Sequence, residues 1–252
     1  MEMKKANYKK YLTVTNLLLL ILTVFYLLDH YLPFPKNYSG FYWANDDKGA
    51  IGYIFGYCGG LLTNFLGTGK VLDPNGTEIY RYATHMLLHR HLLALITNLV
   101  GLYFIGNYAE KRFGRWLTYI IFIVVGVAEV FITDPLYIAM APSKAEEVAT
   151  TVAVGASGGI FALMGASLAA LFFDIKGFKK IGKPTIIVSA IYGVLTTYVV
   201  SFGWTTVCHN VSLILGLILG VMIILPFFLL KKGKFARAEN ADIQADHDKN
   251  TF

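Results

Sequence analysis

The chain has 252 residues, of which 56% are hydrophobic and only 15% are charged, and this composition excludes an ordinary soluble domain. Apolar runs of about twenty residues recur, as expected of a chain that lipid surrounds. The net charge of +6 is attributed to membrane topology rather than to nucleic-acid binding. The two cysteines, Cys58 and Cys208, form neither a disulfide framework nor a metal motif.

The N-terminal third begins with four lysines in residues 1–10, followed by a first predicted span at 11–28. A cleaved signal peptide is the alternative, but no small-residue cleavage site follows the apolar run. Residues 29–84 form a long outer-side loop, and a connection of this length usually carries a function or structure of its own. Its Gly-rich piece 51–66 is too short for a span, so an interfacial or re-entrant segment is expected there.

Five further apolar runs are predicted to cross the membrane, at residues 85–105, 116–132, 152–173, 185–200 and 205–230. The expected fold class is therefore an all-α polytopic membrane protein with a six-helix bundle at residues 11–230. Residues 1–10 are expected to be cytoplasmic, and residues 231–252 to form a disordered cytoplasmic tail.

The distribution of charge predicts the orientation. With six spans, basic clusters at the N-terminus and at residues 110–115, 176–183 and 231–237 all fall on one side, and the acidic loop 134–151 falls on the other. Because Lys and Arg stay inside, both termini are predicted to be cytoplasmic, in a multi-pass protein of the cell membrane.

A candidate nucleophile stands in the segment Gly155-Ala156-Ser157-Gly158-Gly159, expected about five residues into the fourth span. A serine hydroxyl needs a neighbouring base to become nucleophilic. The small neighbours leave Ser157 open to substrate and free backbone N–H groups near the helix start for a developing oxyanion. The alternative is a packing face, because Gly155-x-x-x-Gly159 is a small-xxx-small pattern.

The candidate base is His209, because an ionisable side chain within a membrane helix is costly and suggests a function. It is expected at a depth similar to that of Ser157, on a helix also entered from outside. Gly216 and Gly220 form a close-packing face that is expected to press His209 against the fourth helix. Asn98, deep in the second span, is a candidate oxyanion donor. An interhelical hydrogen bond is the alternative for both polar residues.

These motifs resemble those of rhomboid intramembrane serine proteases over about residues 60–230. The matching positions are Arg81, the His85/His89 pair, Asn98, the segment 110–114, Gly155, Ser157, Gly158, Phe161, His209, Gly216 and Gly220. The resemblance implies a six-helix bundle with a Ser157–His209 dyad and no acid. It also implies an oxyanion hole formed by Asn98 and the Ser157 backbone N–H, and an aromatic residue, Phe161, packed on the histidine. Arg81 looks like the arginine of the family's Trp-Arg pair, with Tyr80 replacing the tryptophan.

Two positions depart from the family pattern. Where rhomboids often carry a second oxyanion-hole histidine, this chain has Ala94, and whether His91 reaches the site is left open. Loss of one such donor typically lowers the rate by about 10²–10³-fold. Ser212 replaces a glycine after the catalytic histidine, which is expected to loosen the packing of the fourth helix on the sixth.

The sequence therefore predicts a serine endopeptidase that cleaves single-span membrane proteins within the lipid bilayer, with no cofactor, metal or nucleic acid. The alternative is a non-catalytic rhomboid-like protein that binds membrane proteins. The hypothesis of a solute transporter depends on the buried acid Glu129 alone. For this residue a helix-joining hydrogen bond, or a position near the membrane interface, is expected instead. A metal site at His85, His89 and His91 lacks the carboxylate of a His-Glu-x-x-His motif. Substrate identity and oligomeric state are left open.

Overall fold

The structure, a computed structural model, describes residues 13–31, 57–58, 80–89, 91–145, 148, 152–173, 183–199 and 203–249. These residues are almost entirely helical, as expected. The α-helices are α1 (Val14–Tyr31), α4 (Arg81–Thr84), α5 (Leu92–Phe113), α6 (Arg115–Met140), α8 (Ser157–Phe173), α10 (Lys183–Val194) and α11 (Trp204–Lys249). The shorter elements are two 3-10 turns, η2 (His85–Leu87) and η3 (Pro142–Lys144), a π-helical turn η4 (Leu195–Val199), and strands β1 (Tyr57–Cys58) and β2 (Val152–Ala153).

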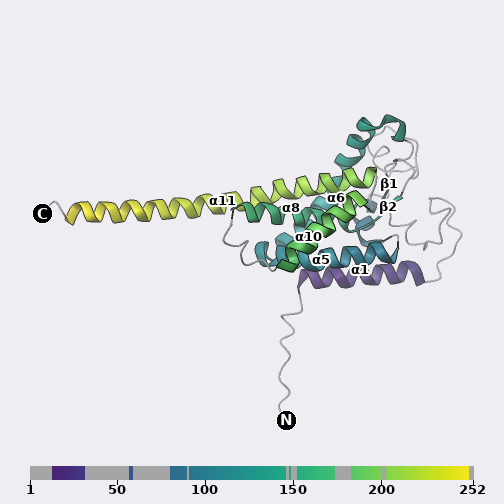
Figure 1. The fold of residues 1–252 in the computed structure, drawn as a ribbon, viewed down its shortest axis with the longest axis horizontal. Helices are drawn as coiled ribbons and strands as arrows, with labels where there is room; N and C mark the ends of the chain where they lie inside the picture. Colours follow the sequence, from purple (N-terminus) through teal and green to yellow (C-terminus); the bar gives the residue numbers. More distant parts are fainter. Residues whose placement is uncertain are drawn as a thin grey trace, which may run out of the picture.

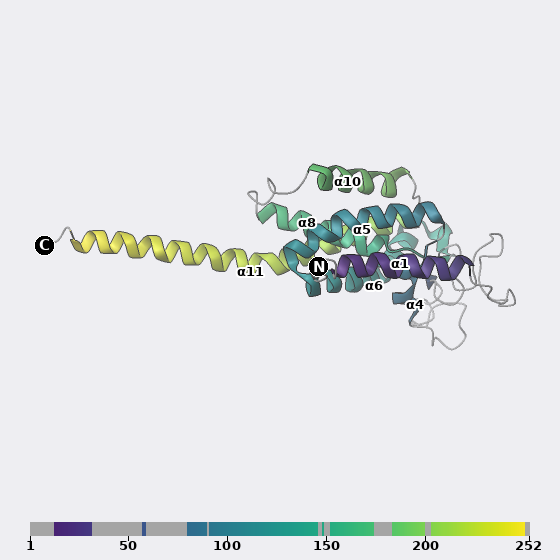
Figure 2. The same cartoon turned by 90° about the horizontal axis from the view of Figure 1, so that it is seen from below.

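Helix α8 lies at the centre of the bundle. It packs most extensively against α11 and also contacts α6 and α5, while α1 and α10 pack on α5. Figure 1 shows α8 and α11 running side by side, with α11 continuing beyond the bundle. Figure 2 shows α10 at one edge of the bundle, beside α5. Most residues of α8 are buried, so protein rather than lipid surrounds this helix.

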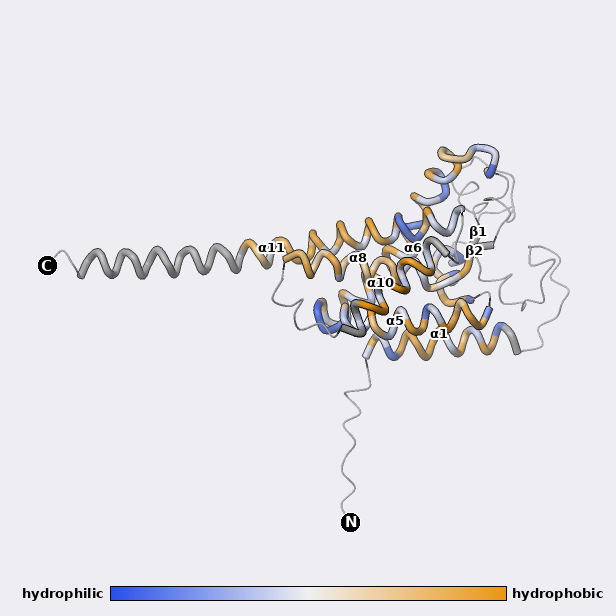
Figure 3. The backbone as a smooth tube through the Cα atoms, in the orientation of Figure 1, coloured by the Kyte–Doolittle hydropathy of each residue, from blue (hydrophilic) through white to orange (hydrophobic). Residues whose placement is uncertain are grey.

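Three of the described helical stretches are long and apolar enough to cross a membrane, namely α5, α6 and residues Trp204–Pro226 of α11. Shorter apolar helices, Val14–Asp29, Ser157–Phe173 and Ile187–Thr197, lie where the first, fourth and fifth spans are predicted. Apolar residues run along the helices of the bundle in Figure 3. The chain is therefore a multi-pass membrane protein.

Two predicted spans begin later than expected. Helix α5 starts at Leu92 rather than at residue 85, because the backbone is extended at Leu88 and at His91, which interrupts the helix. Helix α8 starts at Ser157 rather than at residue 152, because Val152–Ala153 pairs with Tyr57–Cys58 in an antiparallel ladder. Apart from residues 57–58, the predicted re-entrant piece 51–66 lies outside the described residues.

Two helices end later than expected. Helix α6 continues through Pro135 to Met140, so the first residues of the predicted 134–151 loop are helical. Helix α11 continues to Lys249, where the sequence predicted a disordered tail from residue 231. The expected disorder was based on the polarity of these residues. Many of them are Ala, Lys, Arg or Glu, which have high helix propensity.

Small residues bring α8 and α11 into backbone contact. A Cβ atom added to Gly216 would lie 2.1 Å from the Ala162 carbonyl oxygen, and one added to Gly165 would lie 2.1 Å from the Leu213 carbonyl oxygen. A Cβ atom added to Gly220 would lie 2.7 Å from the α-carbon of Ala166 on α8. Only glycine permits such an approach, so the predicted contact of the Gly216 face with the fourth helix is confirmed.

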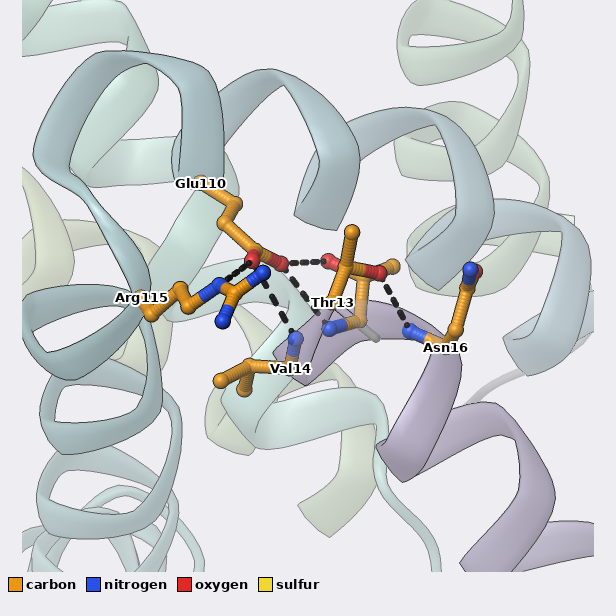
Figure 4. Close-up of polar contacts among 6 residues, drawn as sticks. Thr13, Val14, Asn16, Glu110 and Arg115 are labelled. Atoms are coloured by element: carbon orange, nitrogen blue, oxygen red, sulfur yellow. Dashed lines mark hydrogen bonds and ion pairs between the residues drawn. The ribbon is translucent and has the colours of Figure 1, made fainter. Parts of the chain in front are cut away.

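Glu110, at the end of α5, caps the N-terminus of α1 (Figure 4). Its carboxylate accepts hydrogen bonds from the backbone N–H groups of Val14 (3.2 Å) and Thr15 (3.0 Å) and from the Thr15 hydroxyl (3.0 Å). Arg115 lies 3.5 Å from the same carboxylate. A carboxylate at a helix N-terminus satisfies unpaired donors and complements the helix dipole. The segment 110–114 therefore joins α1 to α5 and lies apart from Ser157.

Candidate active site

Ser157 and His209 are in hydrogen-bond contact, with Nε2 of His209 2.9 Å from Oγ of Ser157. Ser157 is the first residue of α8, and His209 lies in the second turn of α11. The expectation that Ser157 lies five residues inside its helix is thus wrong, yet the two residues still meet. His209 is only 2% exposed, so its ring is held inside the bundle.

The imidazole of His209 stacks on Phe161, one turn below Ser157 on α8. The two ring centroids are 4.4 Å apart and the ring planes differ by 13°. Phe161 is itself buried and contacts Tyr192 of α10 on another side, with centroids 5.4 Å apart. This packing fixes the plane of the imidazole, so Nε2 stays directed at Ser157.

The loop that leads into Ser157 is anchored on η2. Gly155 has a φ of +137°, which disfavours any residue with a Cβ atom, and its N–H donates to the His85 carbonyl at 3.0 Å. Nδ1 of His85 in turn donates to the carbonyl of the buried Arg81 at 3.1 Å. Burial lowers the pKa of His85 to about 4, so its imidazole is neutral near neutral pH. His85, and Arg81 through its bond to His85, thus support the loop that leads into Ser157.

Three polar groups border one small space beside Gly155. The position of a Cβ atom on Gly155 would lie 3.7 Å from Ser157 Oγ, 3.9 Å from Asn98 Nδ2 and 4.0 Å from the Ser157 backbone nitrogen. Because Ser157 begins α8, its N–H has no acceptor within the helix. Ser157 Oγ, Asn98 Nδ2 and the Ser157 backbone nitrogen therefore lie around one point, an arrangement compatible with an oxyanion hole.

The amide of Asn98 has two further partners. Its Oδ1 accepts from the Tyr192 hydroxyl at 2.8 Å, and its Nδ2 lies 2.9 Å from Nε2 of His89. His91 is exposed at the start of α5, so His89 is the histidine that reaches Asn98. Tyr192 is not among the site residues predicted from the sequence. The available signal was a tyrosine hydroxyl within an apolar span, where a buried donor needs a partner.

A buried acid lies directly behind the dyad. The Glu129 carboxyl from α6 contacts Gly158, where an added Cβ atom would lie 2.1 Å from Oε1, and it is hydrogen-bonded to the Ser212 hydroxyl. Ser212 also donates to the Cys208 carbonyl at 2.8 Å and is fully buried. Ser212 therefore joins α11 to α6, and Glu129 makes the helix-joining hydrogen bond that the sequence favoured.

Gly159, the last residue of the segment 155–159, also packs on α6. A Cβ atom on Gly159 would lie 2.6 Å from the ring of Phe122, so the packing interpretation also holds for part of the segment. A half-buried serine and a glycine that packs on α6 therefore lie close together in the segment. Within the described residues, no group of three or more His, Cys, Asp or Glu side chains could hold a metal ion.

A comparison with protein families identifies the family of the chain. A family model for the rhomboid domain matches residues 76–229, which is more than half of the chain and includes Asn98, Ser157 and His209. No curated protein matches the chain at a significant level. Rhomboid proteins are usually intramembrane proteases, although some members are inactive. The family match, together with the apolar helical bundle, shows that this chain belongs to the rhomboid family.

Proposed function

We propose that the chain is an intramembrane serine endopeptidase that cleaves transmembrane segments of single-span membrane proteins. The observation that carries this proposal is the 2.9 Å contact between Ser157 Oγ and His209 Nε2. It is supported by the convergence of Asn98 Nδ2 and the Ser157 N–H beside Gly155. A nucleophile, a base and two oxyanion donors are the parts that acyl transfer requires.

The proposed reaction proceeds in two halves. Nε2 of His209 takes the proton of Ser157 as Oγ attacks the scissile carbonyl, and the resulting oxyanion is bound by Asn98 and the Ser157 N–H. His209 then gives the proton to the leaving amine as the C–N bond breaks, leaving an acyl-enzyme. A water molecule, deprotonated by His209, hydrolyses this ester and restores Ser157. Phe161 keeps the imidazole aligned through both halves.

The proposed topology has six spans in the cell membrane, with both termini cytoplasmic. It is supported by the six apolar helical stretches and by the basic clusters that follow the positive-inside rule. In this orientation α8 and α11 both begin at the outer side, so Ser157 faces water near the outer surface. A substrate helix would have to unwind there for its scissile peptide bond to reach Ser157 Oγ.

The test is cleavage of a model single-span protein in proteoliposomes. Ser157→Ala and His209→Ala are each expected to abolish cleavage, because each removes one half of the dyad. Ser189→Ala is the matched control, since that hydroxyl on α10 donates within its own helix turn, to the Thr185 carbonyl at 2.7 Å. Undiminished cleavage by Ser157→Ala would disprove the proposal.

A fluorophosphonate or isocoumarin probe decides between the enzyme and a non-catalytic binding protein without knowledge of the substrate. The enzyme is expected to be labelled at Ser157, and Ser157→Ala to remain unlabelled. A folded chain that the probe does not label would instead support the binding protein, for which Ala94 in the oxyanion-histidine position would be the reason.

A further inference from the structure

We propose that Tyr192 and His89 are positioning residues that hold the Asn98 amide in the one orientation that offers an N–H to the oxyanion. This inference depends on the proposed protease function. It concerns residues from three different elements: Asn98 on α5, Tyr192 on α10 and His89 between η2 and α5. All three side chains are buried, with exposed fractions of 6% or less.

Tyr192 fixes the oxygen of the amide. Its hydroxyl donates to Asn98 Oδ1 at 2.8 Å. Its ring contacts α5, where a Cβ atom on Gly101 would lie 2.7 Å from two of the ring carbons, and it contacts Phe161 with centroids 5.4 Å apart. The phenol therefore has little freedom to move away, and Oδ1 stays directed toward α10.

His89 fixes the nitrogen of the amide. The amide NH₂ can only donate, so Nε2 of His89, 2.9 Å from Nδ2, accepts the bond and the neutral ring carries its proton on Nδ1. If the amide turned over, the His89 ring would have to carry its proton on Nε2 to donate to Oδ1, and the Tyr192 hydroxyl would have to accept from the amide instead of donating. With Tyr192 as donor and Nε2 of His89 as acceptor, one orientation of the Asn98 amide satisfies both partners.

The consequence concerns the second N–H of Nδ2. One N–H is bound to His89, and the other remains for the space beside Gly155 that Ser157 Oγ and the Ser157 backbone nitrogen also border. Pre-oriented donors stabilise a transition state because no reorganisation is needed during the reaction. With Ala94 in place of the oxyanion-hole histidine that rhomboids often carry, the orientation of Asn98 matters more in this chain.

The experiment is a double-mutant cycle on cleavage of a model single-span substrate by the full chain. Tyr192→Phe removes only the hydroxyl and is expected to lower kcat about 10-fold with little change in KM, since the oxyanion forms only in the transition state. Asn98→Ala is expected to lower kcat about 10²–10³-fold. In the Asn98→Ala background, Tyr192→Phe is expected to have no further effect.

A second variant tests the hydrogen-bond partner of the amide nitrogen. His89→Leu removes the acceptor for Nδ2 and is expected to lower kcat about 10-fold, again with no effect in the Asn98→Ala background. Tyr103→Phe is the matched control for loss of a phenol hydroxyl, since Tyr103 lies on α5 with half of its surface exposed. It is expected to cleave like the parent chain.

Three results would overturn the inference. A parental kcat in folded Tyr192→Phe would show that the hydroxyl does not orient Asn98, and so would an undiminished further loss in the Asn98→Ala background. If Tyr192→Phe fails to fold, a parental kcat in His89→Leu overturns it equally. These failures leave the Ser157 dyad intact, whereas absence of cleavage and probe labelling in the parent chain would remove the proposed function as well.

Discussion

The carboxyl group of Glu129 fills the space beside the α-carbon of Gly158, the residue that follows Ser157. The same carboxyl is hydrogen-bonded to Ser212, which lies one turn after His209 on α11. One acid on α6 therefore contacts the immediate neighbourhood of both dyad residues. Its partner Ser212 occupies a position where the family often has glycine. The hydrogen bond between Ser212 and Glu129 therefore joins α6 to α11 next to the dyad.

The first prediction is that Gly158→Ala destabilises the protein. Its Cβ atom would lie 2.1–2.2 Å from the Glu129 oxygens, which Ser212 holds in place. Overpacking of this kind typically costs about 1–3 kcal/mol, measurable by reversible unfolding in mixed detergent micelles. Gly193→Ala on α10 is the control, because its Cβ atom would meet only the flexible end of Met164 at 3.3 Å. Equal stability of the two variants would contradict the tight contact with Glu129.

The second prediction concerns the stacking of Phe161 on His209. Phe161→Leu keeps an apolar side chain in the buried site but removes the flat surface against which the imidazole lies. Misalignment of a catalytic group costs up to about 10²-fold in rate, so kcat is expected to fall by about 10-fold or more. Phe104→Leu, at a half-buried position of α5, is expected to keep the parental kcat. A parental rate in Phe161→Leu would mean that other contacts align the ring.

The third prediction is that Gly216→Ala separates α8 from α11. The added methyl group would lie 2.1 Å from the Ala162 carbonyl oxygen, and backbone atoms cannot turn aside as a side chain can. The free energy of unfolding is expected to fall by about 1–3 kcal/mol or more. Because these helices carry Ser157 and His209, labelling of Ser157 by a fluorophosphonate should fall in parallel. Normal labelling with lowered stability would show that the dyad contact survives the separation.

The fourth prediction compares Glu110 with its ion-pair partner Arg115. Glu110→Ala removes the acceptor of three hydrogen bonds at the start of α1 and is expected to cost about 1–2 kcal/mol. Arg115→Ala is expected to change stability by less than about 1 kcal/mol, because Arg115 is 54% exposed and surface ion pairs contribute little. Thermal unfolding of both variants measures the difference. A larger loss for Arg115→Ala would assign the effect to the ion pair instead.

The position of each helix along the chain was largely predictable, because hydropathy is a local property of the sequence. The helix ends were less so. Pairing of residues 152–153 with 57–58 delays the start of α8 until Ser157, and this pairing is a long-range contact. Because α8 starts at Ser157, the serine N–H is one of the donors at a helix start that have no acceptor within the helix. A count of apolar residues cannot reveal this position.

The sequence by itself determined the membrane class of the protein, its family resemblance, and the candidate pair Ser157 and His209, since these follow from composition, spacing and chemistry. The tertiary structure alone decided that His89, rather than His91, reaches Asn98, that Tyr192 completes the amide's partners, and that Glu129 lies behind Gly158. The physical reason is that contacts between helices depend on the rotation and depth of each helix. Those are set by the close approach of small residues throughout the bundle, and not by any one segment.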